Sequence, residues 1–231
     1  MVSKEMKLFM GEKLYVLKNG EAIYNYAQSY ADDYIETEDR EKGQIYLDLL
    51  YIAFMEGYIS ESVCYDIGLM VNDGFLISGH NESESINLAA AILQFAVERC
   101  ESGMCAALIS SMYENGTTGY IQKDGNLAWE WLFRAAQLGD SEAQLVVGTH
   151  FYKNMRKPYD AEMWWLASAE NGNEKAMYNL GVLYESSAFC DYPRAGEWFQ
   201  LAAENGIVEA EEILRRSYEY SQRHQKWLKR I

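Results

Sequence analysis

Three segments near the C-terminal end repeat one sequence pattern at a fixed interval. They end at Gly139, Gly172 and Gly206, which lie 33 and then 34 residues apart. Each segment carries a tryptophan followed by a pair of small residues, and these are Trp131, Trp164 and Trp198 with Ala135-Ala136, Ser168-Ala169 and Ala202-Ala203. A period of about 34 residues is typical of stacked helical hairpins. Such stacks form extended surfaces that commonly hold another protein.

A second helix in each unit is marked by a small residue. Gly148 and Gly181 lie inside apolar helical patterns, although a glycine there costs about 1 kcal/mol relative to alanine. We infer that a neighbouring helix approaches these positions too closely for a Cβ atom. The preceding units hold Ser110, Gly68 and Ala27 at the same position. The repeat therefore covers nearly the whole chain.

The two patterns together predict a series of about twelve helices. Helices of the tryptophan type are expected at residues 5–18, 44–56, 87–101, 126–138, 160–171 and 194–205. Helices of the small-residue type are expected at residues 21–31, 61–73, 104–116, 141–153, 174–186 and 208–229. Pro158 and Pro193 fall just ahead of tryptophan-type helices, where a proline can begin a helix but cannot continue one.

These residues resemble the Sel1-like repeat, a relative of the tetratricopeptide repeat. The pattern Ala-x-x-Trp-x-x-x-Ala-Ala-x-x-Gly, followed by Ala-x-x-x-Leu-Gly-x-x-Tyr-x-x-Gly, is matched well over residues 126–218 and loosely before them. The resemblance implies an all-α fold, a right-handed superhelix of about six α/α hairpins. It also implies an adaptor without catalytic residues, as in bacterial members linked to secretion, host contact or signalling.

We expect one solenoid over residues 1–231, with divergent repeats at 1–122 and well-matched repeats at 123–218. A basic capping helix is expected at 208–231. Arg215 stands there at the small position, and no helix can pack closely over an arginine. Six basic residues between Arg215 and Arg230 give the polar end that a solenoid needs.

Charge is the second informative feature. The chain has 35 acidic and 20 basic residues, a net charge of −15, and neither lysine nor arginine occurs from Gly43 to Glu98. Just before that stretch lie Asp32, Asp33, Glu36, Glu38, Asp39 and Glu41, which we interpret as loop residues. This acidity is either a solvated face that keeps the protein soluble or a docking surface for a basic partner, with Glu36, Glu38, Asp39 and Glu41 as candidate contacts. Nucleic acid is disfavoured as a partner because clustered lysine and arginine occur only in the C-terminal helix.

The tetratricopeptide geometry also points to a groove. In that geometry the first helix of each hairpin lines the concave face, and its positions map to Tyr24, Gln28, Tyr65, Leu69, Leu145, Thr149, Tyr178 and Val182. Tyrosine at such positions offers a large contact area at low entropic cost. Half-exposed packing is the alternative role for these tyrosines. The repeated tryptophans are expected in the core, since each hairpin buries an apolar stripe.

The sequence contains no recognisable catalytic or metal-binding motif. His80, His150 and His224 lie far apart outside known catalytic motifs, and the four cysteines form no CxxC pair. We therefore expect no catalytic residue, no metal and no cofactor. No run approaches the roughly 18 apolar residues of a membrane span, and we expect a cytoplasmic protein. The leading function is a scaffold that binds a basic protein; the alternative is an immunity protein or antitoxin that neutralises a basic toxin such as a nuclease.

Overall fold

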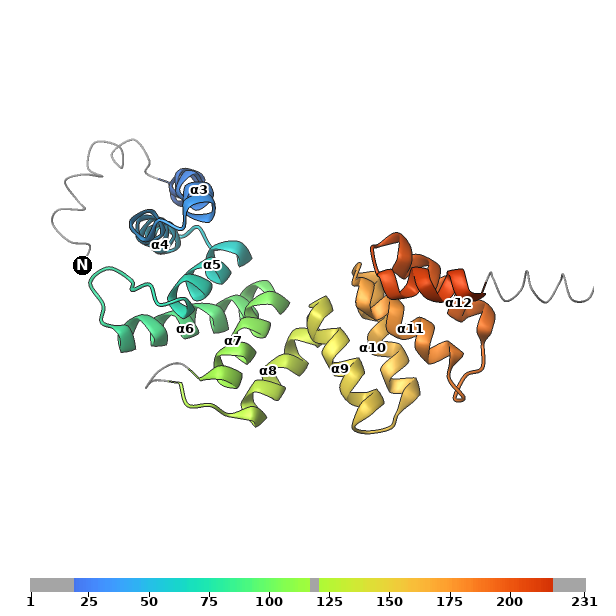
Figure 1. Ribbon diagram of the computed structural model, residues 1–231. Helices are drawn as coiled ribbons and strands as arrows, with labels where there is room; N and C mark the ends of the chain where they lie inside the picture. The colour runs from blue at the N-terminus through green and yellow to red at the C-terminus, as the bar shows by residue number, and fades with distance from the viewer. Residues whose placement is uncertain (1–18, 117–120, 218–231) are drawn as a thin grey trace, which may run out of the picture. The chain divides into compact units, whose positions relative to one another are not determined.

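The computed structural model describes residues 19–116 and 121–217 (Figure 1). Its helices are α3 (Gly20–Thr37), α4 (Arg40–Met55), α5 (Glu61–Asn72), α6 (Glu82–Cys100), α7 (Gly103–Asn115), α8 (Gly125–Gln137), α9 (Ser141–Lys153), α10 (Pro158–Glu170), α11 (Glu174–Glu185) and α12 (Tyr192–Glu204). Residues 208–217 are also helical. The predicted helix at 5–18 and residues 218–231 of the capping helix lie outside the described residues.

Consecutive helices pack as hairpins, in which a small-residue helix pairs with the tryptophan-type helix that follows it. The pairs are α3 with α4, α5 with α6, α7 with α8, α9 with α10, and α11 with α12. This arrangement confirms the predicted all-α repeat solenoid. The chain divides into two compact units, residues 1–138 (unit 1) and 139–231 (unit 2). A single solenoid over the whole chain, and its handedness, stay predictions.

The helix starts follow from the sequence. Asn81 and Glu84 form a capping box at α6, in which each side chain accepts from the other residue's backbone N–H at 2.9 Å. Asn173 caps α11 through the backbone N–H of Ala176, at 3.1 Å. Pro158 is the first residue of α10 and Pro193 the second of α12. The predicted role of the two prolines is confirmed.

The acidic run is not a loop, contrary to our expectation. Helix α3 continues to Thr37 and α4 begins at Arg40, so most of the run is helical. The reason is an apolar contact beyond the predicted end, where the Tyr34 ring packs edge-on against Phe75 with centroids 5.6 Å apart. Tyr34 also lies against Gly43, where an added Cβ would stand 2.9 Å from the tyrosine ring.

In unit 2 the small positions lie directly under bulky side chains of the following helix. A Cβ added to Gly181 would stand 2.7 Å from the Phe199 ring, and one added to Gly148 would stand 2.6 Å from the Trp165 ring. Real Cβ contacts are not this short, so both glycines are required by the close approach of two helices. The predicted packing role of these glycines is confirmed.

Unit 1 uses the same position in three ways. A Cβ on Gly68 would stand 2.7 Å from Leu93 of α6. Ser110 is buried, and its hydroxyl donates a hydrogen bond of 2.7 Å to the carbonyl of Ala128 on α8. Ala27 is fully buried on α3. A small side chain is therefore kept at this position in every described hairpin.

The repeated tryptophans are not the most buried residues of their helices, which corrects our expectation. Trp131, Trp164 and Trp198 are half-buried. The next residue is the core anchor in unit 2, since Trp165 is 3% exposed and Phe199 is 2% exposed. The buried stripe of α10 runs through Ala161, Trp165 and Ser168 at helical spacing. Trp164 stands on the flank of that stripe.

We expect opposite effects from two glycine-to-alanine changes. Gly181→Ala should destabilise the protein, because overpacking costs about 1–3 kcal/mol and exceeds the gain in helix propensity. Gly196→Ala should stabilise it by up to about 1 kcal/mol, because Gly196 lies inside α12 and nothing would stand within 4 Å of its Cβ. Urea denaturation of both variants measures the difference. Equal effects would contradict the assigned packing.

Two aromatic truncations in α12 test the corrected core. Phe199→Ala should cost about 3–5 kcal/mol of folding free energy, as expected for a buried aromatic residue. Trp198→Ala should cost clearly less, because that side chain is only partly buried against the same core. Thermal and urea denaturation report both values. A larger loss for Trp198→Ala would restore the tryptophan as the anchor.

Candidate binding groove

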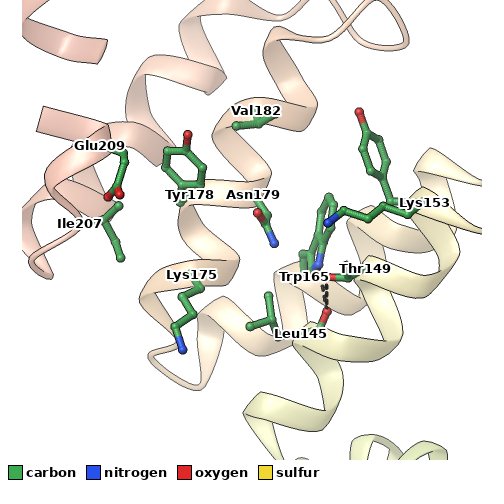
Figure 2. Close-up of a pocket in the computed structure, with 11 residues that line it drawn as sticks. Leu145, Thr149, Lys153, Trp165, Lys175, Tyr178, Asn179, Val182, Ile207 and Glu209 are labelled. Carbon is green, nitrogen blue, oxygen red and sulfur yellow. Dashed lines mark hydrogen bonds between the residues drawn. The ribbon is translucent and has the colours of Figure 1, made fainter. Parts of the chain in front are cut away.

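The side chains of two helices in unit 2 face each other across a pocket of about 730 Å³ (Figure 2). Leu145, Thr149 and Lys153 follow one face of α9 at intervals of one helical turn. Lys175, Asn179 and Val182 follow α11 at similar spacing. Tyr152, Trp165, Tyr178, Ile207 and Glu209 complete the lining. The pocket is therefore made by consecutive repeats, which present equivalent faces.

The hydrophobic core holds the apolar lining in place. The indole N–H of Trp165 donates a hydrogen bond of 3.2 Å to the carbonyl of Leu145 (Figure 2). Tyr152 packs against Trp165 with ring centroids 5.4 Å apart, and Tyr178 packs against Phe199 at 5.7 Å. These side chains are fixed before any partner arrives, so a ligand would not have to order them.

Polar groups of the pocket remain available. Among the described residues, the side-chain amide of Asn179 has no hydrogen-bond partner and Lys153 has no ion pair. Lys175 lies 3.7 Å from Glu142, but both side chains are more than half exposed, so this pair contributes little. The pocket thus combines an apolar lining with one free amide, two lysines and the carboxylate of Glu209.

The structure brings four sequence-predicted residues together here, namely Leu145, Thr149, Tyr178 and Val182. Sequence reasoning missed Asn179, Lys175 and Trp165. The signal for the first two was present, because they share the helical stripe of Val182 on α11. The binding role of all these residues stays a prediction.

In unit 1 the predicted groove positions of α3 lie at a group of aromatic and acidic side chains. We call this group the tyrosine cluster and define it as Tyr24, Tyr46, Tyr58 and Asp66. The Tyr46 hydroxyl donates a hydrogen bond of 2.7 Å to Oδ2 of Asp66 and accepts one of 3.4 Å from Gln28. The rings of Tyr24 and Tyr58 lie 5.2 Å apart at an interplanar angle of 31°. Tyr24 and Gln28 stand one turn apart on α3, and their role in a groove stays a prediction.

Burial governs the electrostatics of this cluster. It raises the pKa of the Asp66 carboxyl, and the hydrogen bond from Tyr46 partly offsets that rise. It also raises the pKa of Tyr24, with a further rise from the nearby charge of Asp66. The carboxyl group of Asp66 is thus ionisable and partly shielded from solvent.

The repeats of the two units can be aligned by their small positions, Gly68 on α5 and Gly181 on α11. Tyr65, Asp66 and Leu69 of α5 occupy the positions that Tyr178, Asn179 and Val182 occupy on α11. Tyr65 and Leu69 are half-buried, one turn apart. One surface of the repeat thus carries a carboxylate in unit 1 and a neutral amide in unit 2.

The acidic run forms an exposed edge on α3 and α4. We call it the acidic edge, and it consists of Asp32, Asp33, Glu36, Glu38, Asp39 and Glu41. Lys42 forms an ion pair of 2.8 Å with Asp33. Asp39 caps α4 by accepting a hydrogen bond of 2.9 Å from the backbone N–H of Glu41. Asp39 therefore has a structural role as well as a charge.

Other titratable side chains, outside the pocket and the tyrosine cluster, make structural contacts or are buried. Asp48 is buried and accepts hydrogen bonds from the backbone N–H and the hydroxyl of Ser78, at 3.2 and 2.9 Å. Burial raises the pKa of Cys64 to about 12 and that of Cys105 to about 11, so both thiols stay protonated at neutral pH. His150 contacts Asn154 through Nδ1 at 2.9 Å.

No helix of the described residues has the length and apolarity needed to cross a membrane.

Comparison with known proteins identifies a known repeat in two segments of the chain. The Sel1 repeat model matches residues 104–140 and 174–207. The first range covers the α7–α8 hairpin and the second covers the α11–α12 hairpin. Both matches therefore begin with a small-residue helix and end after a tryptophan-type helix.

Similar proteins are a yeast protein and two bacterial structures. Chitin synthase regulator SKT5 of Saccharomyces cerevisiae is 26% identical over 151 residues, which cover 61% of this chain and only 20% of the yeast protein. A Sel1 repeat protein from Oxalobacter formigenes is 21% identical, with a TM-score of 0.60 over 84% of this chain and 76% of that one. The protein c5321, a protective antigen present in uropathogenic Escherichia coli strains, displays an SLR fold and is 21% identical, with a TM-score of 0.59 over 85% of this chain and 40% of that one. The chain therefore contains Sel1 repeats at residues 104–140 and 174–207, and its fold resembles that of solved Sel1 repeat structures.

Proposed function

We propose that the chain is a non-enzymatic protein-binding module whose unit 2 pocket holds an extended segment of a partner. The observation that carries the proposal is the pocket itself, in which equivalent positions of α9 and α11 present one apolar lining. Repeat proteins of this kind bind partners along such surfaces.

The chemistry of the pocket suits a polypeptide. An apolar side chain placed against Leu145 and Val182 would gain about 25 cal/mol for each Å² of apolar surface removed from water. The amide of Asn179 can donate to and accept from a peptide backbone. Lys153 and Lys175 favour acidic residues near that apolar anchor.

A charge placed in the pocket should abolish this binding. Peptides are first selected from a random display library on the whole chain. They should lose affinity about tenfold or more with Val182→Glu, because the new carboxylate removes the apolar contact and competes with acidic peptide residues for Lys153 and Lys175. Leu201→Glu is the matched control, since Leu201 is 41% exposed on α12 outside the pocket, against 38% for Val182. Fluorescence polarisation of labelled peptides measures both affinities.

Leu201→Glu should change affinity by less than about twofold. Equal losses in the two variants would show binding outside the pocket. Failure to select any peptide that competes for it would also count against the proposal.

The acidic edge is proposed to speed the approach of a basic partner. Its residues are exposed, and charges of this kind act mainly on association rates. The inhibitor alternative, in which the partner is a basic toxin, would use the same edge. That alternative rests on charge and stays a prediction.

Reversing three of these charges tests the edge. Glu36→Lys, Glu38→Lys and Glu41→Lys together should slow association of a basic partner, and the wild-type rate should fall as salt shortens the screening length to about 10 Å at 0.1 M. Asp39 is left unchanged because it caps α4, and loss of a cap costs about 1 kcal/mol. Stopped-flow fluorescence measures the rates. Association indifferent to both salt and the reversals would overturn the edge proposal.

A further inference from the structure

Asp66 is a half-buried carboxylate without a basic partner. Tyr46 donates to its Oδ2 at 2.7 Å, and within the described ranges no lysine or arginine pairs with it. Lysine and arginine are also missing from Gly43 to Glu98, so α5 itself offers no cation to Asp66. A partly desolvated carboxylate in this state is unfavourable for the free protein and ready to bind a cation.

Aromatic rings stand beside this carboxylate. The rings of Tyr24 and Tyr58 lie 5.2 Å apart, and the charge of Asp66 contributes to the raised pKa of Tyr24. The tyrosine cluster thus joins π faces with a carboxylate and a hydroxyl, the groups that recognise a cationic side chain.

We propose that the tyrosine cluster of unit 1 binds an arginine side chain of a protein partner. The proposal rests on the function proposed above and names the chemistry that unit 1 recognises. Charge complementarity supports the proposal, because a guanidinium would supply the positively charged partner that the Asp66 carboxylate lacks among the described residues. Tyr46, whose hydroxyl accepts from Gln28, donates to one oxygen of the carboxylate and helps to orient it for such a contact.

Arginine fits the cluster better than the other cations. Its planar guanidinium stacks on aromatic faces and still donates hydrogen bonds along its edge, whereas a lysine ammonium is a compact and strongly hydrated charge. A metal ion would need more ligands than one carboxylate, and no group of three or more His, Cys, Asp or Glu in the described part of the chain could hold one. The preferred occupant is therefore a guanidinium.

Titration with short peptides tests the site without the natural partner. An acetylated and amidated glycine-serine peptide with one central arginine is added to the whole chain, and backbone amide shifts are followed by NMR. We expect saturable shifts around Tyr24, Tyr58 and Asp66. The citrulline peptide, which keeps the shape and lacks the charge, should bind about tenfold more weakly, and the lysine peptide several-fold more weakly.

A matched pair of variants separates a specific contact from general attraction. Asp66→Asn should weaken the arginine peptide about tenfold, whereas Glu130→Gln, which removes one exposed charge on α8 outside the tyrosine cluster and the acidic edge, should change affinity less than about twofold. The thermal midpoint of free Asp66→Asn should be equal to or higher than that of the wild type, because the desolvated charge is gone. A purely structural role would lower that midpoint instead.

Several results would overturn the proposal. They are equal losses in Asp66→Asn and Glu130→Gln, equal binding of the citrulline or lysine peptide, and shifts centred away from the tyrosine cluster. If library peptides still occupy the unit 2 pocket while the arginine peptide fails to bind, only the arginine site is wrong. If both fail, the proposed protein-binding function is also wrong.

Discussion

The close approach of a small-residue helix to a bulky side chain of the next helix underlies the rest of the structure. In unit 2 the rings of Phe199 and Trp165 lie over Gly181 and Gly148 at distances that leave no room for a Cβ. A glycine inside a helix is unfavourable by itself. The contact outweighs that cost because it lets two helices bury their apolar stripes at short range.

This packing also sets the surface opposite the core. When Gly181 is held against Phe199, Val182 and Asn179 must point away from it, on the next part of the helical wheel. The same rule places Thr149 on α9, beside the buried Leu145, and the two helices then line one pocket. The partner surface is thus a geometric consequence of the hairpin core, while its chemistry varies freely from Asn179 in one unit to Asp66 in the other.

Sequence alone predicted the hairpins and part of the pocket. The repeat fixed the small positions, and helical spacing then located Tyr178 and Val182. It could not show that Phe199 rather than Trp198 is buried, because both are aromatic neighbours and their burial depends on helix rotation. The extension of α3 to Thr37 depends on a contact between Tyr34 and Phe75, which are distant in sequence. The cluster around Asp66 likewise joins three helices and has no local pattern.

A double-mutant cycle between Gly181 and Phe199 tests the underlying contact most directly. Free energies of unfolding are measured for Gly181→Ala, Phe199→Leu and the double variant. If the added methyl group is unfavourable because it meets the Phe199 ring, its cost should largely vanish beside the smaller and more adaptable leucine, with a coupling energy of about 1 kcal/mol or more. Additive effects within about 0.5 kcal/mol would show that the two positions do not interact in this way.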